Sequence, residues 1–215
     1  MEKPGYDVNS AMKIYVEMLG KNSLRFEQKK LFYTLEQATK FLLNTPLKPH
    51  SVVFLGTSPH IFELTKVAGY KSAQNYLSSR WIPGLLTNWL QKKPHLQYYR
   101  NLDTYFKYLR TGKIAKLQNT LETKHVTIKN YFRMHKDWEG MLNLVERPKL
   151  LIILDAENQE GAIREAYRAG VPTIALTNLK TDPRLITYPL LCDTDNMEHV
   201  IFYTDLLARL LRTKR

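Results

Sequence analysis

The side chains of this chain that could do chemistry are a few acids, six histidines and one cysteine. Asp155 follows an apolar run, which is where a parallel sheet presents ligand-binding carboxylates. Glu157 and Asp182 are the acids that could join it around a cation, but no ligand spacing supports such a site. The histidines form no H-E-x-x-H pair, and Cys192 lies beside acids that raise the pKa of its thiol. These patterns predict no catalytic residue, no metal and no cofactor.

One turn in the sequence leaves an enzyme as the alternative function. Gly56-Thr57-Ser58-Pro59 follows a predicted strand and opens a predicted helix, and amides at a helix N-terminus can hold a phosphate. The turn lacks the lysine of a Walker motif, and no G-x-G-x-x-G occurs in the chain. The alternative is therefore a small-molecule or phosphate-binding enzyme on a Rossmann-like sheet that has lost its standard loop.

The charge of the chain favours a nucleic acid as its partner. The 215 residues include 32 Lys and Arg against 20 Asp and Glu, a net charge of +12. A compact domain with this excess repels itself unless an anion such as phosphate neutralises it. No apolar run reaches the roughly 18 residues of a membrane span, so we expect no membrane partner. The excess is concentrated in residues 91–149, which carry 13 Lys and Arg and 5 Asp and Glu among many aromatic rings.

The elements that must position these residues follow from apolar periodicity and capping signals. Apolar runs predict strands at 51–56, 73–77, 149–155, 173–176 and 188–191. A short helix is predicted at 9–19 and a longer one at 160–169. Three more helices are predicted to begin at capping signals: a capping box at Thr34, the N-cap Ser58, and a cap at Asp195 or Asn196. Strands that alternate with helices of this length predict an α/β fold, a parallel sheet with helices on both faces.

The segment between the two halves of this pattern, residues 91–148, is predicted to be helical. Ile114, Leu121 and Ile128 are spaced by seven residues, which predicts two antiparallel helices that fold back near Thr111-Gly112 as a coiled-coil hairpin. Most of the aromatic rings are expected in the seam of this hairpin. The predicted organisation is an N-terminal extension over 1–23, an α/β domain made of 24–90 and 149–215, and a helical hairpin insertion over 91–148.

Several motifs resemble the small-subunit ribosomal protein S2 family. Residues 80–89, R-W-I-P-G-L-L-T-N-W, resemble its R-W-L-G-G-x-L-T-N-[FW] segment. Further likeness, in the family's order, lies in residues 53–57, 151–157, 162–166, 170–178, 182–190 and 193–202, so that it covers about 24–211. Ser58 replaces a family lysine, Pro83 replaces a family glycine, and the family's G-x-H-F-G-H segment is missing at the N-terminus.

The resemblance implies a flavodoxin-like sheet with an inserted hairpin and no enzyme activity or small-molecule substrate. It implies a structural constituent of the small ribosomal subunit that binds its rRNA and neighbouring ribosomal proteins. The departures from the family pattern favour a mitochondrial ribosome in the organelle matrix. An RNA-binding factor outside the ribosome is a further alternative. Charge and position near the hairpin predict these RNA contacts: Arg80, Lys92, Lys93, Arg100, Lys113 and Lys116.

Overall fold

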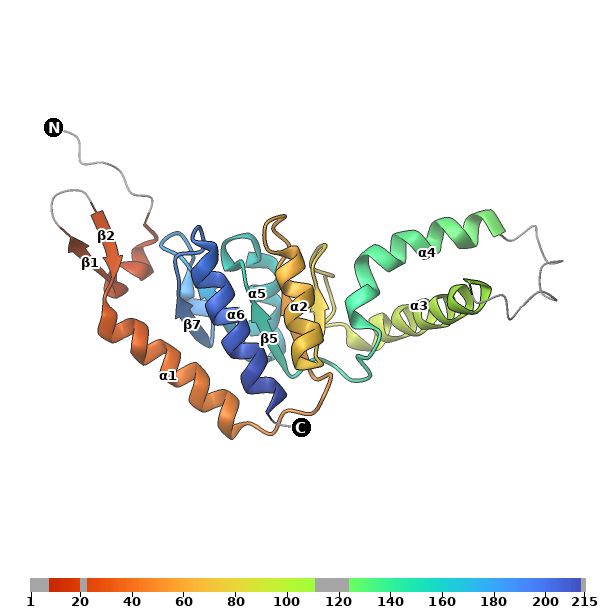
Figure 1. Cartoon of the computed structure of the whole chain (residues 1–215), viewed down its shortest axis with the longest axis horizontal. Coiled ribbons are helices and arrows are strands. Elements are labelled where there is room, and N and C mark those ends of the chain that lie inside the picture. Colours follow the sequence, from red (N-terminus) through yellow and green to blue (C-terminus); the bar gives the residue numbers. More distant parts are fainter. Residues whose placement is uncertain (1–7, 20–22, 111–123, 214–215) are drawn as a thin grey trace, which may run out of the picture.

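The centre of the molecule is a five-stranded, all-parallel sheet (Figure 1). The computed structural model describes residues 8–19, 23–110 and 124–213. The strand order is β4-β3-β5-β6-β7, the flavodoxin-like order: β4 is added on one side of β3, and the later strands are added on the other side, beginning with β5. This confirms the predicted flavodoxin-like α/β fold. The strands are β3 (Val52–Leu55), β4 (Asn75–Leu77), β5 (Leu150–Ile153), β6 (Thr173–Thr177) and β7 (Tyr188–Leu191).

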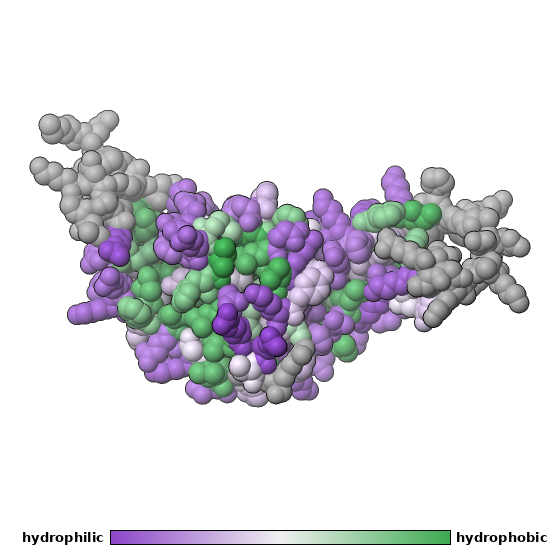
Figure 2. Space-filling model, viewed as in Figure 1, coloured by the Kyte–Doolittle hydropathy of each residue, from purple (hydrophilic) through white to green (hydrophobic). Residues whose placement is uncertain are grey.

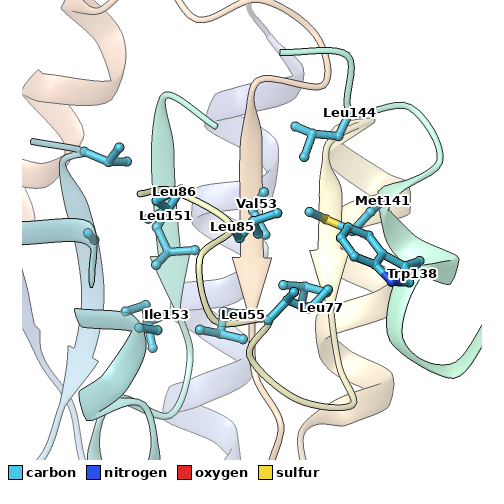
Figure 3. Close-up of a cluster of buried hydrophobic side chains, with 14 of the residues drawn as sticks. Val53, Leu55, Leu77, Leu85, Leu86, Trp138, Met141, Leu144, Leu151 and Ile153 are labelled. Atoms are coloured by element: carbon cyan, nitrogen blue, oxygen red, sulfur yellow. The ribbon is translucent and has the colours of Figure 1, made fainter. Parts of the chain in front are cut away.

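Both faces of the sheet are buried because other elements cover them, and successive strand side chains point alternately into the two cores. Val52 and Phe54 pack under α1 (Gln28–Asn44), α2 (Phe62–Ser72) and α6 (Met197–Arg212), which cover one face. Val53 and Leu55 belong to a second core under α5 (Glu160–Ala169) and the loop at 81–88 on the other face (Figure 3). The uninterrupted apolar runs of β3 and β5 are explained by this double burial.

Capping signals located some helix ends and missed others. Gly170 ends α5 at φ 64°, and the Asn196 side chain caps α6 by accepting from the amide of Glu198 at 3.0 Å. The predicted start at Thr34 is wrong: α1 begins at Gln28, and the Thr34 hydroxyl donates to the carbonyl of Leu31 inside the helix. A hydroxyl can bond back to its own helix as well as cap it, and sequence does not separate the two.

The predicted helix over 9–19 is also replaced. Residues Ser10–Tyr15 form a 3-10 helix, η1, and β1 (Val16–Leu19) pairs antiparallel with β2 (Ser23–Phe26). Val16 is already extended and pairs opposite Phe26, so this strand pairing wins over the helical periodicity. The β1–β2 pair spans the boundary predicted after residue 23, with β1 before it and most of β2 after it. The division of the chain into units remains a prediction.

Two helices lie between β4 and β5 in sequence and extend beyond the β4 edge of the sheet (Figure 1). They are α3 (Trp89–Arg110) and α4 (Lys124–Trp138), which we call the inserted helices, and a 3-10 helix, η4 (Glu139–Met141), follows. The Tyr131 ring of α4 lies 6.2 Å from Tyr99 and 4.2 Å from Phe106 of α3, between ring centroids. The turn near Thr111 and the spaced Ile114 and Leu121 lie outside the described residues, so the coiled-coil hairpin remains a prediction.

Candidate nucleic-acid interface

The segment at 80–89 is organised around one carboxylate on α5. Glu165 accepts hydrogen bonds from the amides of Gly84 (3.0 Å), Leu86 (2.8 Å) and Thr87 (3.1 Å). It also accepts from the Trp81 indole (2.9 Å) and the Thr87 hydroxyl (3.2 Å). Burial of Glu165 favours the neutral acid, but these donors outweigh it and hold the pKa of Glu165 below its usual range. The sequence motif is thus a loop wrapped around an anion that the protein itself supplies.

This loop fixes where the inserted helices leave the sheet. Leu85 and Leu86 are fully buried and lie with Val53, Leu55 and other strand residues in one core (Figure 3). Gly84 has φ 82°, a conformation that favours glycine and lets its amide reach the carboxylate. Because α3 begins directly after the loop, the same contacts that hold the loop also anchor the base of α3.

Two of the predicted RNA contacts have internal partners. Arg80 donates through Nε to Asp137 at 2.8 Å and through its terminal nitrogen to the same carboxylate, which joins the loop to α4. Arg100 donates to the backbone carbonyls of Leu142, at 2.7 Å from Nε, and Leu144, and burial lowers its pKa. Arg80 therefore holds α4 against the loop, and Arg100 holds α3 against the segment after η4. The Arg80 side chain still has 69% of its surface exposed.

The other four predicted contacts are lysines. Lys92 and Lys93 lie in the first turns of α3, where Lys93 is exposed and the half-buried Lys92 lies beside Gly84. Within the described ranges, neither lysine forms an ion pair, so no acid neutralises either ammonium group. Lys113 and Lys116 lie outside the described residues.

Sequence reasoning missed a basic row on α4. Lys129, Arg133 and Lys136 follow one another at spacings of four and three, which places them on one face of the helix. All three are exposed, and none forms an ion pair with another residue that the structure describes. Phe132, next to them in the chain, is 60% exposed and offers a ring to an unpaired base. The helical spacing in the sequence was a signal that could have found this row.

Some of the aromatic rings on α3 and α4 are part of the packing, whereas Tyr98, Tyr108 and Phe132 are exposed. Tyr99, Tyr131 and Trp138 are buried, and the Tyr131 hydroxyl donates to Asp103 at 3.2 Å. Asp103 also pairs with Lys107 at 2.6 Å. Asp103 is therefore paired within the two helices and Asp137 is paired with Arg80 of the loop, so neither acid neutralises the basic side chains on the surface of α4.

The crevice where such a sheet binds ligands is closed by the chain itself. Between β3 and β5, Asp155 Oδ2 accepts from the amides of Thr57 (3.1 Å) and Ser58 (3.0 Å) and from the Ser58 hydroxyl (2.8 Å). These are the donors that a bound phosphate would need. The carboxylate occupies this turn, and α2 begins only at Phe62, later than predicted. This arrangement disfavours the phosphate-binding enzyme.

The other residues that were considered for catalysis or metal binding do not form a shared site. Glu157 accepts from Asn178, and Asp182 pairs with Arg184, so neither acid joins Asp155. No group of three acids, histidines or cysteines able to hold a metal occurs among the residues that the structure describes. Burial raises the pKa of the Cys192 thiol to about 12, which makes it a poor nucleophile. No helix in the described ranges is long and apolar enough to cross a membrane.

Comparison with known proteins decides the family. The model of the family described as "Ribosomal protein S2" matches residues 6–213. The chain belongs to the ribosomal protein S2 family. It is 30% identical over 175 residues to the small ribosomal subunit protein uS2 of Rhizobium rhizogenes and to that of Agrobacterium fabrum, and 29% identical to that of Brucella melitensis. Each match covers 81% of this chain and 66% of the relative, so the chain spans just under two thirds of the relatives' length.

Membership in the S2 family confirms one prediction, and the relatives overturn another. Ribosomal protein S2 is a structural, non-enzymatic family, so the prediction that the chain is not an enzyme is confirmed. The prediction of a mitochondrial ribosome is wrong. The relatives named above are bacterial proteins, which points to a bacterial ribosome instead.

Proposed function

We propose that this S2-family protein is a structural constituent of the small ribosomal subunit that contacts rRNA and neighbouring ribosomal proteins. The observation that carries the proposal is the family match over residues 6–213. Two features of the structure support it. The ligand crevice of the sheet is closed by Asp155, and positive charge that has no ion-pair partner in the described part of the chain gathers on the inserted helices.

The proposed RNA contacts are the basic side chains of α3 and α4 that form no ion pair or hydrogen bond with another described residue. They are Lys92 and Lys93 at the base of α3 and the α4 row, Lys129, Arg133 and Lys136. Lysine and arginine on a helix surface bind backbone phosphates, a sequence-independent contact suited to a structural protein. Arg80 and Arg100 act in this proposal by positioning the insertion, and Lys113 and Lys116 stay predicted contacts.

Sedimentation of the native protein through a sucrose gradient, with and without ribonuclease, tests this function. We expect the chain to migrate with the small subunit and to lose that position after ribonuclease digestion. Recovery at the top of both gradients would contradict a ribosomal role. A small molecule that stabilises the free protein against heat would then favour the enzyme alternative.

A further inference from the structure

A pocket of about 840 Å³ lies far along the molecule from the inserted helices, at the carboxyl ends of β6 and β7. We call it the β7-end pocket. Its other walls come from β2, the start of α1 and α6. Its apolar lining includes Phe26, Leu31, Phe32, Leu191, Phe202 and Tyr203.

Two of these rings face solvent. Phe32 is 68% exposed and Phe202 is 59% exposed. Phe202 also borders a groove of about 540 Å³ between α2 and α6, where Val67 and Ile201 are exposed as well. Figure 2 shows apolar side chains gathered over α6 and its neighbours on this face. Exposed apolar surface that continues across three helices is typical of a protein–protein contact.

The charges at the rim of the β7-end pocket disfavour RNA as its occupant. Asp193 and Asp195 line the pocket, and neither forms an ion pair with a residue that the structure describes. The lining also contains two permanently charged cations, Lys180 and Arg25. Lys180 pairs with Glu157 at 3.7 Å, which leaves Arg25 to face the two acids. In a chain of net charge +12, two rim carboxylates of this kind repel phosphate and attract a cationic side chain.

We propose that the β7-end pocket receives a segment of a neighbouring small-subunit protein. A large apolar side chain of that segment packs against Phe32 and Phe202, and a Lys or Arg next to it meets Asp193 and Asp195. An apolar anchor seated in a pocket, with charged groups at the rim around it, is typical of such a contact. The inference rests on the proposed ribosomal function and adds to it the surface and the chemistry of the protein partner.

Site-directed photo-crosslinking in assembled subunits tests this proposal. The chain carries Phe32→p-benzoylphenylalanine, and a matched variant carries Tyr167→p-benzoylphenylalanine on α5, where Tyr167 is 64% exposed on the other face of the sheet. Small subunits are purified, irradiated and analysed by mass spectrometry. We expect the probe at residue 32 to cross-link one protein segment that contains a basic residue beside an apolar one. The probe at residue 167 is expected not to reach this segment.

Charge reversal at the rim supplies the second readout. Asp193→Lys combined with Asp195→Lys is expected to lower the yield of this cross-link about fivefold, the scale of an exposed ion pair. The same charge change at the exposed Glu36 and Glu160 should leave the yield unchanged. Cross-links from residue 32 to rRNA, or to no macromolecule, in subunits that contain the chain would overturn the pocket proposal alone. Absence of the chain from the subunit peak would overturn the ribosomal function and the pocket proposal together.

Discussion

At the scale of single residues, Glu165 is the side chain on which the family motif depends. Glutamine keeps its shape but offers one acceptor oxygen to donors that now use two, so buried amides of the loop lose their partner. We expect Glu165→Gln to lower the free energy of unfolding by about 2–3 kcal/mol in urea denaturation. Glu160→Gln, at an exposed position on the same helix, should cost less than about 0.5 kcal/mol. Equal losses for the two variants would contradict the role of Glu165.

The two buried carboxylates, Glu165 and Asp155, should respond to pH in opposite directions. The pKa of Glu165 is lowered in the folded protein, so its contribution to stability is present above its unfolded pKa of about 4.3 and is lost as the pH falls below it. Burial raises the pKa of Asp155 despite its hydrogen bonds from Ser58 and Thr57. Its contribution is therefore largest below its unfolded pKa of about 3.9 and declines as the pH rises through the folded pKa.

Urea unfolding of the wild type, Glu165→Gln and Asp155→Asn between pH 3 and pH 8 measures this difference. The advantage of the wild type over Glu165→Gln should shrink towards acid. The stability of the wild type relative to Asp155→Asn should decline as the pH rises from about 4. Parallel curves for all three proteins would contradict both assignments.

At the scale of elements, α4 is expected to provide the phosphate contacts. Replacing Lys129, Arg133 and Lys136 together by Gln should weaken binding to small-subunit rRNA. It should also reduce the slope of log affinity against log salt by about 0.7–0.9 for each phosphate that the variant no longer neutralises. A control with the same charge change replaces the exposed Lys29, Lys48 and Arg212, which lie outside the insertion. Filter binding across a salt series checks this, and equal slopes for the two variants would contradict the assignment.

Sequence patterns predicted the elements whose signals are local. The apolar runs of β3, β5 and β7 and the glycine that ends α5 are such signals. The start of α1 was missed because Thr34 bonds backward within the helix, and the β1–β2 pair was missed because strand pairing depends on a distant partner. The partners of Arg80 and Arg100 were also hidden, because Asp137 and the carbonyl of Leu142 lie 57 and 42 residues away in sequence.

At the scale of the whole molecule, the surface is divided by chemistry. The inserted helices at one end carry basic groups that pair with no acid in the described ranges, and the β7-end pocket at the other end is apolar with acids at its rim. Internal carboxylates, Glu165 and Asp155, occupy two places where backbone amides converge. The sheet therefore separates the basic end, where we propose the RNA contacts, from the apolar end, where we propose the protein contact.

Competitive incorporation into the small subunit tests the central claim, that the inserted helices hold this protein on rRNA. The wild type is produced together with either the α4 triple variant or the triple control, and the ratio in the purified subunit peak is measured by mass spectrometry. The α4 variant should fall to about one tenth of the wild type or less, since removing three phosphate-binding side chains should cost more than about 1.4 kcal/mol. The control should stay near its input ratio. Equal incorporation of the α4 variant and the wild type would contradict the claim.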